Sequence, residues 1–204
     1  ISDLFVYFHT GNSYEHIDAE GNTQIIVDLV IYDSEDKSNI DAFDAAYLAN
    51  ILNPNNNHIA TDCNARYARF VLPMNQGTNS RIGYQELSEV RGVEFPMYSY
   101  ENYNTQQYEF TYLVGYGHCN DNTETEIYRV NDRLIKQRLP IYPSTTISNP
   151  VIYSKENHYF QEAVFVPDPD GDDEDDGVVL SLGFDSINNK SYLLILDAKT
   201  FEEI

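Results

Sequence analysis

At 204 residues the chain is long enough for one domain with a sizeable core, and 42% hydrophobic with 22% charged residues fits a folded protein rather than a disordered one. The net charge of −21 comes without a Lys/Arg cluster that could neutralise phosphates, so we expect no nucleic-acid partner. The same charge disfavours electrostatic attachment to an anionic membrane but leaves attachment through apolar side chains open. Two cysteines, Cys63 and Cys119, are too few for a disulfide scaffold and mildly favour a reducing compartment.

Runs of β-branched and aromatic residues dominate the chain and predict an all-β fold. In chain order, the expected strands cover residues 4–9, 23–32, 65–73, 108–117, 125–131, 161–167, 177–185 and 191–198. One helix is predicted over residues 39–52, where apolar residues recur near one helical face before NPNNN ends the pattern. The later strands have short polar connections, which is typical of antiparallel meanders and fits a sandwich, a barrel or a propeller.

The most acidic stretch is FVPDPDGDDEDDGVVLSL, in which seven of the ten residues from Asp168 to Gly177 are acidic. A calcium loop of the EF-hand type needs Gly at its sixth position and Glu at its twelfth. Counting from Asp168 puts Asp173 at the sixth position, and counting from Asp172 puts Gly183 at the twelfth, so both registers fail. We therefore interpret the run as a solvated turn between two strands, in preference to a cation site.

The sequence contains no HxH or HxxxH pair, GxSxG, CxxC or Gly-rich phosphate loop, so motifs alone predict no catalytic residue. Four of the five histidines lie in polar contexts and are interpreted as surface or structural residues: His16, His58, His118 and His158. His9 differs because it closes an apolar run and precedes the turn-like segment HTGNSYE. Strand ends are where barrels and propellers present side chains to a central site, although a lone histidine there is more often structural.

Eight segments, in order along the chain, together carry a family resemblance: FVYFHTGNSYE, IIVDLVIY, YLAN, ARYARFVLP, GVEFPMYSY, EAVFVP, EDDGVVLSL and YLLILDAKTFEE. In them the chain resembles the carotenoid cleavage oxygenases, most closely the animal branch of β-carotene oxygenases, insect carotenoid isomerooxygenase and retinoid isomerohydrolase. The resemblance is weakest over residues 118–159. It implies a seven-bladed β-propeller, of which residues 1–204 would form a single segment of about three blades with the predicted helix in an insertion.

The resemblance also implies a non-haem Fe(II) centre held by four histidines, three of them oriented by glutamates. His9 falls on the third iron-ligand histidine, and Glu94 in VEFP falls on the glutamate that hydrogen-bonds it. Glu162 in QEAVFVP falls on the glutamate that serves the fourth histidine, although Ala163 stands where the family usually has proline. A ligand imidazole needs an acceptor for its second nitrogen, so a carboxylate suits this role.

The other three ligands are expected outside the chain, two before residue 1 and one beyond Ile204, with the N-terminal part and the C-terminal end of the family domain. The expected activity of the intact protein is cleavage, or isomerisation and cleavage, of a carotenoid or retinoid polyene with O₂. The segment alone is expected to be inactive. A non-catalytic carotenoid- or retinoid-binding protein on the same scaffold is the alternative, and an acidic interaction domain with chance similarity is a third hypothesis. We expect a cytoplasmic protein that could contact membranes peripherally.

Overall fold

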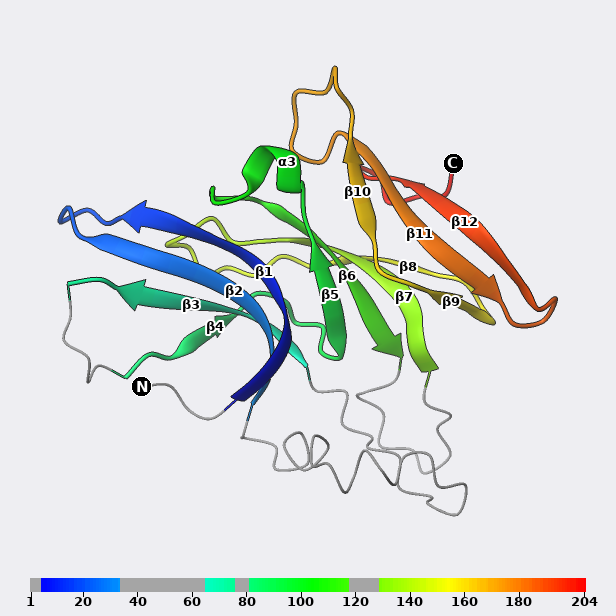
Figure 1. Ribbon diagram of the computed structural model, residues 1–204, viewed down its shortest axis with the longest axis horizontal. Helices are drawn as coiled ribbons and strands as arrows, with labels where there is room; N and C mark the ends of the chain where they lie inside the picture. The colour runs from blue at the N-terminus through cyan, green and yellow to red at the C-terminus, as the bar shows by residue number, and fades with distance from the viewer. Residues whose placement is uncertain (1–4, 34–64, 76–80, 118–128) are drawn as a thin grey trace, which may run out of the picture.

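The computed structural model describes residues 5–33, 65–75, 81–117 and 129–204, which form three four-stranded antiparallel sheets (Figure 1). This confirms the predicted all-β class. The described part of the chain contains one short helix, α3 (Tyr100–Tyr103). The helix predicted over residues 39–52 lies outside the described residues, as do both cysteines, His58 and His118. No helix among the described residues has the length and apolar character needed to cross a membrane.

Each sheet is built from four strands that follow one another along the chain. The first sheet has the order β1 (Phe5–Ile17), β2 (Thr23–Asp33), β3 (Arg66–Pro73), β4 (Tyr84–Glu86). The second has the order β5 (Val93–Met97), β6 (Phe110–Gly117), β7 (Arg129–Arg138), β8 (Val151–Ser154). The third contains β9 (His158–Phe160), β10 (Val164–Pro167), β11 (Gly177–Asp185) and β12 (Lys190–Asp197). Here β9 and β10 pair with successive parts of β11, while β12 pairs along its length.

The strands with long apolar runs lie close to where the sequence predicts them. Strands β2, β3, β6, β11 and β12 match their predicted ranges to within two residues, and β10 covers the last part of 161–167. The prediction of a strand that ends at His9 is wrong, because β1 continues to Ile17. Of the range 125–131 only its last residues are described, and they begin β7. Strands β4, β5, β8 and β9 were not predicted, since they are three to five residues long and β5 contains a proline.

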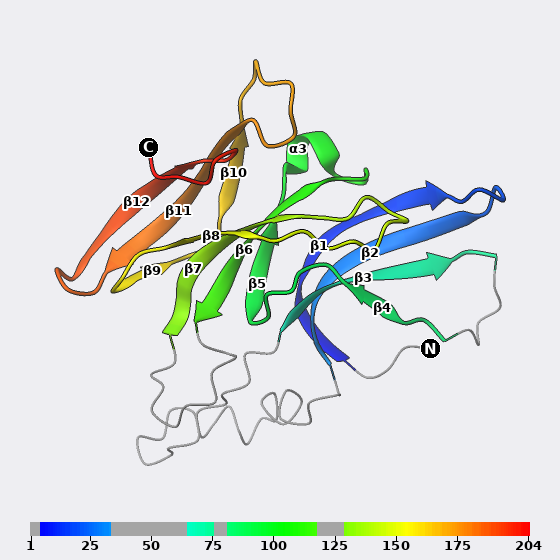
Figure 2. The same cartoon turned by 180° about the vertical axis from the view of Figure 1, so that it is seen from behind.

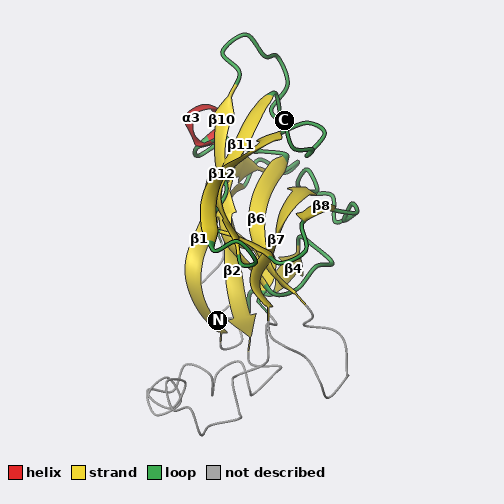
Figure 3. Cartoon of the chain, turned by 90° about the vertical axis from the view of Figure 1, so that its right-hand side faces the viewer, coloured by secondary structure: helices red, strands yellow, loops and turns green. Residues whose placement is uncertain are grey.

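Two apolar layers join the three sheets, which lie side by side in Figures 1 and 2 and overlap in the side view of Figure 3. The first layer joins the first two sheets and includes Ile26 and Val30 of β2. The second joins the second and third sheets and includes Tyr112 and Phe165, whose rings stack 5.4 Å apart. Leu29, on the opposite face of β2, belongs to a third cluster. Because β2 is buried on both faces, apolar residues occupy successive positions instead of alternating ones, with Asp28 as the polar exception.

A buried ionic network also holds the first two sheets together. Arg69 Nε and Nη2 each donate to the Asp28 carboxylate at 2.8 Å, and Arg69 Nη1 donates to the Pro140 carbonyl at 2.8 Å. The Tyr108 hydroxyl donates to Asp28 Oδ2 at 2.7 Å and is hydrogen-bonded to the Tyr67 hydroxyl. Burial raises the pKa of Tyr108 well above its ordinary value, so its hydroxyl keeps its proton. The buried charges are thus paired and hydrogen-bonded, as the loss of solvation requires.

Candidate functional site

His9 and Glu94, 85 residues apart in sequence, form a hydrogen-bonded pair between the first and second sheets. The His9 Nδ1 atom lies 2.8 Å from Glu94 Oε2. The Glu94 side chain is 3% exposed, while the His9 side chain is 41% exposed. A carboxylate can only accept, so a neutral His9 imidazole that donates to it carries its proton on Nδ1 and keeps the lone pair on Nε2. The pair therefore presents one oriented nitrogen ligand at a partly open surface.

Irregular pairing of β1 with β2 places His9 on the face that meets Glu94. From Tyr7 to Thr10, β1 advances by three residues while β2 advances by two. The same happens from Thr10 to Ser13, so β1 has one extra residue in each interval. Strict alternation would put His9 on the opposite face from Asn12, which is buried against the second sheet. The extra residue in the bulge between them puts the His9 and Asn12 side chains on the same face of the strand. Bulges of this kind re-aim side chains and are common next to active sites.

A further irregularity, in the pairing of β5 with β6, presents Glu94. Three steps along β5, from Glu94 to Met97, oppose two along β6. Phe95 within this bulge has a φ of 55°, which is uncommon for a residue other than glycine, and its ring lies 4.5 Å from the His9 ring between centroids. Such backbone conformations have an energetic cost and cluster at functional sites. Strained backbone, aromatic ring and carboxylate therefore converge on one imidazole.

Asn12, which lies three residues after His9 on β1, forms hydrogen bonds to the segment that follows β5. Its Nδ2 donates to the carbonyls of Tyr103 and Gln106, each at 2.8 Å. Its Oδ1 accepts from the Tyr98 hydroxyl and the Thr105 backbone N–H, each at 3.2 Å. Asn12 is 2% exposed, so these contacts replace solvent for the whole amide group. Sequence reasoning missed this residue, because a polar side chain in a turn-like context gives no sign of burial.

Glu162, the other predicted glutamate, lies away from His9. It precedes β10 and is exposed, and no hydrogen-bond partner for its side chain occurs within the described ranges. Its neighbour Ala163 is fully buried in the core between the second and third sheets. Of the predicted site residues, the structure thus brings His9 and Glu94 together and leaves Glu162 apart from them.

Comparison with known proteins identifies the family. A family model described as retinal pigment epithelial membrane protein (RPE65) matches residues 1–204. Several carotenoid-cleaving dioxygenases are also similar to the chain. The chain belongs to the carotenoid oxygenase family. This confirms the resemblance found in the sequence.

Individual relatives of this chain come from plants, insects and mammals. The chain is 31% identical over 207 residues to the chloroplastic carotenoid cleavage dioxygenase 8 homolog B of Oryza sativa, covering 98% of this chain and 32% of that protein. It is 29% identical to the carotenoid isomerooxygenase of Galleria mellonella, with 97% and 35% covered. A mitochondrial carotenoid-cleaving dioxygenase of Mustela putorius furo is 36% identical over 59% of this chain and 19% of its own length.

Solved structures share the fold. Cobalt-substituted Synechocystis ACO superposes with a TM-score of 0.67 at 22% identity, covering 98% of this chain and 36% of that one. An ACO/RPE65 chimera gives 0.66 at the same identity. Our chain therefore spans between about a fifth and a third of the length of these relatives.

The acidic turn joins β10 to β11, as predicted, but it is only partly solvated. Glu174 accepts hydrogen bonds from the backbone N–H groups of Glu109 and Phe110 at 2.8–2.9 Å, and burial raises its pKa. Asp175 is 7% exposed and accepts from Lys136 Nζ at 2.6 Å. Both contacts are to the second sheet, so the turn ties two sheets together. The prediction of a solvated turn is wrong for these two residues.

The turn also contains the one group of three acidic residues, among those described, whose oxygens are close enough to share a cation: Asp173, Asp175 and Asp176. Lys199 Nζ lies 2.9 Å from Asp173 and 2.7 Å from Asp176, and Lys136 pairs with Asp175. Hydrogen bonding to Lys199 lowers the pKa of Asp176 below its ordinary value. Ammonium groups thus already neutralise these carboxylates, which supports the interpretation of the run as structural.

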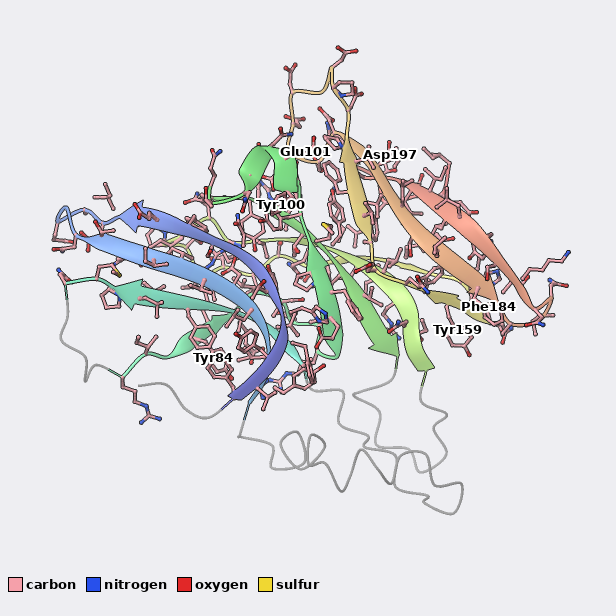
Figure 4. All side chains as sticks on the ribbon, viewed as in Figure 1. Tyr84, Tyr100, Glu101, Tyr159, Phe184 and Asp197 are labelled. Atoms are coloured by element: carbon pink, nitrogen blue, oxygen red, sulfur yellow. The ribbon has the colours of Figure 1, made fainter. Side chains whose placement is uncertain are left out.

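A cleft of about 710 Å³ separates helix α3 from β10. One wall carries Tyr100 and Glu101 of α3, both labelled in Figure 4, and the other runs from Val164 to Gly171. Its lining combines aromatic, aliphatic and acidic groups.

At the far end of the third sheet Figure 4 shows Phe184 beside Tyr159, its partner in the pairing of β11 with β9.

Proposed function

We propose that this chain is part of a non-haem Fe(II) oxygenase that cleaves, or isomerises and cleaves, a carotenoid or retinoid polyene with O₂. The observation that carries the proposal is the His9–Glu94 pair, a partly exposed imidazole oriented by a nearly buried carboxylate at 2.8 Å. Metal-ligating histidines almost always donate their second ring N–H to such a partner. The names of the relatives support the reaction class, since they are carotenoid-cleaving dioxygenases and a carotenoid isomerooxygenase.

The donor chemistry at this site fits Fe(II). Imidazole nitrogen is a suitable ligand for iron, and the hydrogen bond to Glu94 leaves Nε2 of His9 to bind it. When bound, Fe(II) would supply the activation of O₂. Three further histidines would come from parts of the protein outside this chain, and one of them would take Glu162 as its partner. The three four-stranded sheets would be about three blades of a seven-bladed propeller.

The surroundings of His9 suit an apolar, conjugated substrate. The Phe95 ring contacts the imidazole, and the Phe8 ring meets the Tyr32 ring edge-on with centroids 5.9 Å apart. Phe8 is 56% exposed in this chain. Aromatic faces and edges favour contact with a polyene over contact with water. The role of these residues would be to hold the polyene near the imidazole and to keep water away from it.

The test is product formation by the intact protein, purified with Fe(II) and supplied with O₂ and β-carotene or a retinoid. Wild type is expected to form apocarotenals or a cleaved retinoid, detected by liquid chromatography with mass spectrometry, whereas His9→Ala is expected to form none. Binding of the polyene without turnover by iron-loaded wild type would instead support the non-catalytic binding protein. Wild-type turnover by His9→Ala would refute the ligand assignment.

A further inference from the structure

Glu94 is held by two donors from the first sheet, and only one of them is His9. The Tyr32 hydroxyl, on β2, donates to Glu94 Oε1 at 2.5 Å, while His9 contacts Oε2. The Phe95 backbone N–H adds a longer contact of 3.3 Å to Oε2. The two carboxylate oxygens thus have different partners, and Tyr32 is the side chain that engages the oxygen facing away from His9.

This arrangement restricts the rotation of the carboxylate. The last torsion of a glutamate side chain is broad and roughly two-fold, so a single hydrogen bond defines its plane poorly. A second hydrogen bond to the other oxygen defines the plane. Because ionised Glu94 can only accept, Tyr32 must be the donor in its bond. The Glu94 side chain is 3% exposed, so no solvent layer can replace that donor fully.

The Tyr32 ring is itself held in place. It packs against the core between the first two sheets and meets the Phe8 ring edge-on. Its backbone pairs with Val6 on β1, in the regular part of the ladder just before the first bulge. The hydroxyl therefore comes from a rigid element, which is what the support of a binding site requires.

We propose that Tyr32 is a positioning residue for the metal site, which fixes the Glu94 carboxylate so that Glu94 in turn fixes the His9 ring. The proposal rests on the proposed function, since it takes His9 as a metal ligand. Tyr32 acts through two hydrogen bonds and needs no contact with the metal. Loss of its hydroxyl leaves His9 and Glu94 in place but less well oriented.

The experiment measures metal affinity in the intact protein, without turnover. Fe(II) binding is determined by competition with a chelator, and the visible absorption of bound Co(II) reports the ligand geometry; a cobalt-substituted form is known for the Synechocystis protein. Loss of a group that orients a metal ligand typically weakens binding by roughly 10–100-fold. Tyr32→Phe is expected near the lower limit, about ten-fold, with a shifted Co(II) spectrum. Tyr32→His, which keeps a ring N–H donor, is expected to lie between Tyr32→Phe and wild type and serves as the test if Tyr32→Phe does not fold.

Tyr153→Phe is the matched control, because the Tyr153 hydroxyl also donates to a glutamate, Glu203, at 2.8 Å, but in another part of the fold. It is expected to leave both the affinity and the spectrum unchanged. Wild-type affinity and spectrum in Tyr32→Phe, beside lost binding in His9→Ala, would overturn the role of Tyr32 alone. Unchanged binding in His9→Ala would overturn the proposed function and the role of Tyr32 together.

Discussion

Replacement of Arg69 by methionine tests the buried network that joins the first two sheets. Arg69 and Asp28 both have fully buried side chains, and the Arg69 guanidinium makes three hydrogen bonds in all, one of them to the Pro140 carbonyl. Arg69→Met leaves the Asp28 carboxylate buried, with Tyr108 as its remaining donor in this network. Removing one partner of a buried ion pair costs about 3–5 kcal/mol, because the other charge stays without compensation.

The double variant separates the interaction energy of the Arg69–Asp28 pair from the cost of leaving one charge buried without its partner. Asp28→Asn with Arg69→Met removes both charges and keeps an acceptor for Tyr108, so its cost is expected to fall below the sum of the single costs by about 1–3 kcal/mol. Arg138→Met is the control, because Arg138 pairs with Glu109 but its side chain is 64% exposed. This change is expected to cost at most about 1 kcal/mol.

The assay is urea unfolding of the intact protein, followed by far-ultraviolet circular dichroism. A cost below about 1 kcal/mol for Arg69→Met would refute the reasoning, since an uncompensated buried carboxylate is expected to cost several times that. Strict additivity in the double variant would refute it as well, because contacting charges are expected to couple.

Three further predictions concern the supports of the site and the acidic turn. Gly11→Ala would place a Cβ 2.1 Å from the Tyr67 hydroxyl oxygen and is expected to lower the free energy of unfolding by about 1–3 kcal/mol, whereas Gly83→Ala, with open space at its Cβ, is expected to be tolerated. Asn12→Asp removes the donors to two carbonyls and is expected to cost about 1–3 kcal/mol and to speed hydrogen exchange in residues 98–106; unchanged exchange would contradict the anchoring role. Burial raises the pKa of Glu174 above its ordinary value of 4.5, so the folded protein keeps this proton to a higher pH than the unfolded chain does. The free energy of unfolding of the wild type, relative to that of Glu174→Gln, is therefore expected to fall as the pH rises above 4.5, as measured by urea titrations. A difference that grows with pH would contradict this.

The long strands could be predicted from the sequence because their signal is local. Strand β11 was predicted with its observed bounds, since a mostly apolar run, with Ser181 and Gly183 as exceptions, lies between a glycine-containing turn and a polar one. The extent of β1 could not be predicted, because its bulges place polar residues where strict alternation expects apolar ones. Likewise β5 carries a proline and a residue with positive φ, which argue against a strand unless the partner strand is known.

The candidate site was predictable in part, and only through family resemblance. Neither composition nor spacing connects His9 with Glu94, since their contact depends on bulges in two different sheets. Tyr32 and Asn12 carried no signal at all, because an aromatic residue in an apolar run and a polar residue in a turn-like segment both read as ordinary. The partial burial of the acidic turn was missed for the same reason, as its cationic partner Lys136 lies 39 residues away in sequence.

The most direct test of the central claim, that His9 is an iron ligand, is the iron content of the purified intact protein in His9→Ala and His16→Ala. Both histidines lie on β1, but His16 packs edge-on against the Tyr142 ring, away from Glu94. The iron-ligand assignment predicts that His9→Ala loses its iron while His16→Ala keeps the wild-type content. Wild-type iron content in His9→Ala would contradict it.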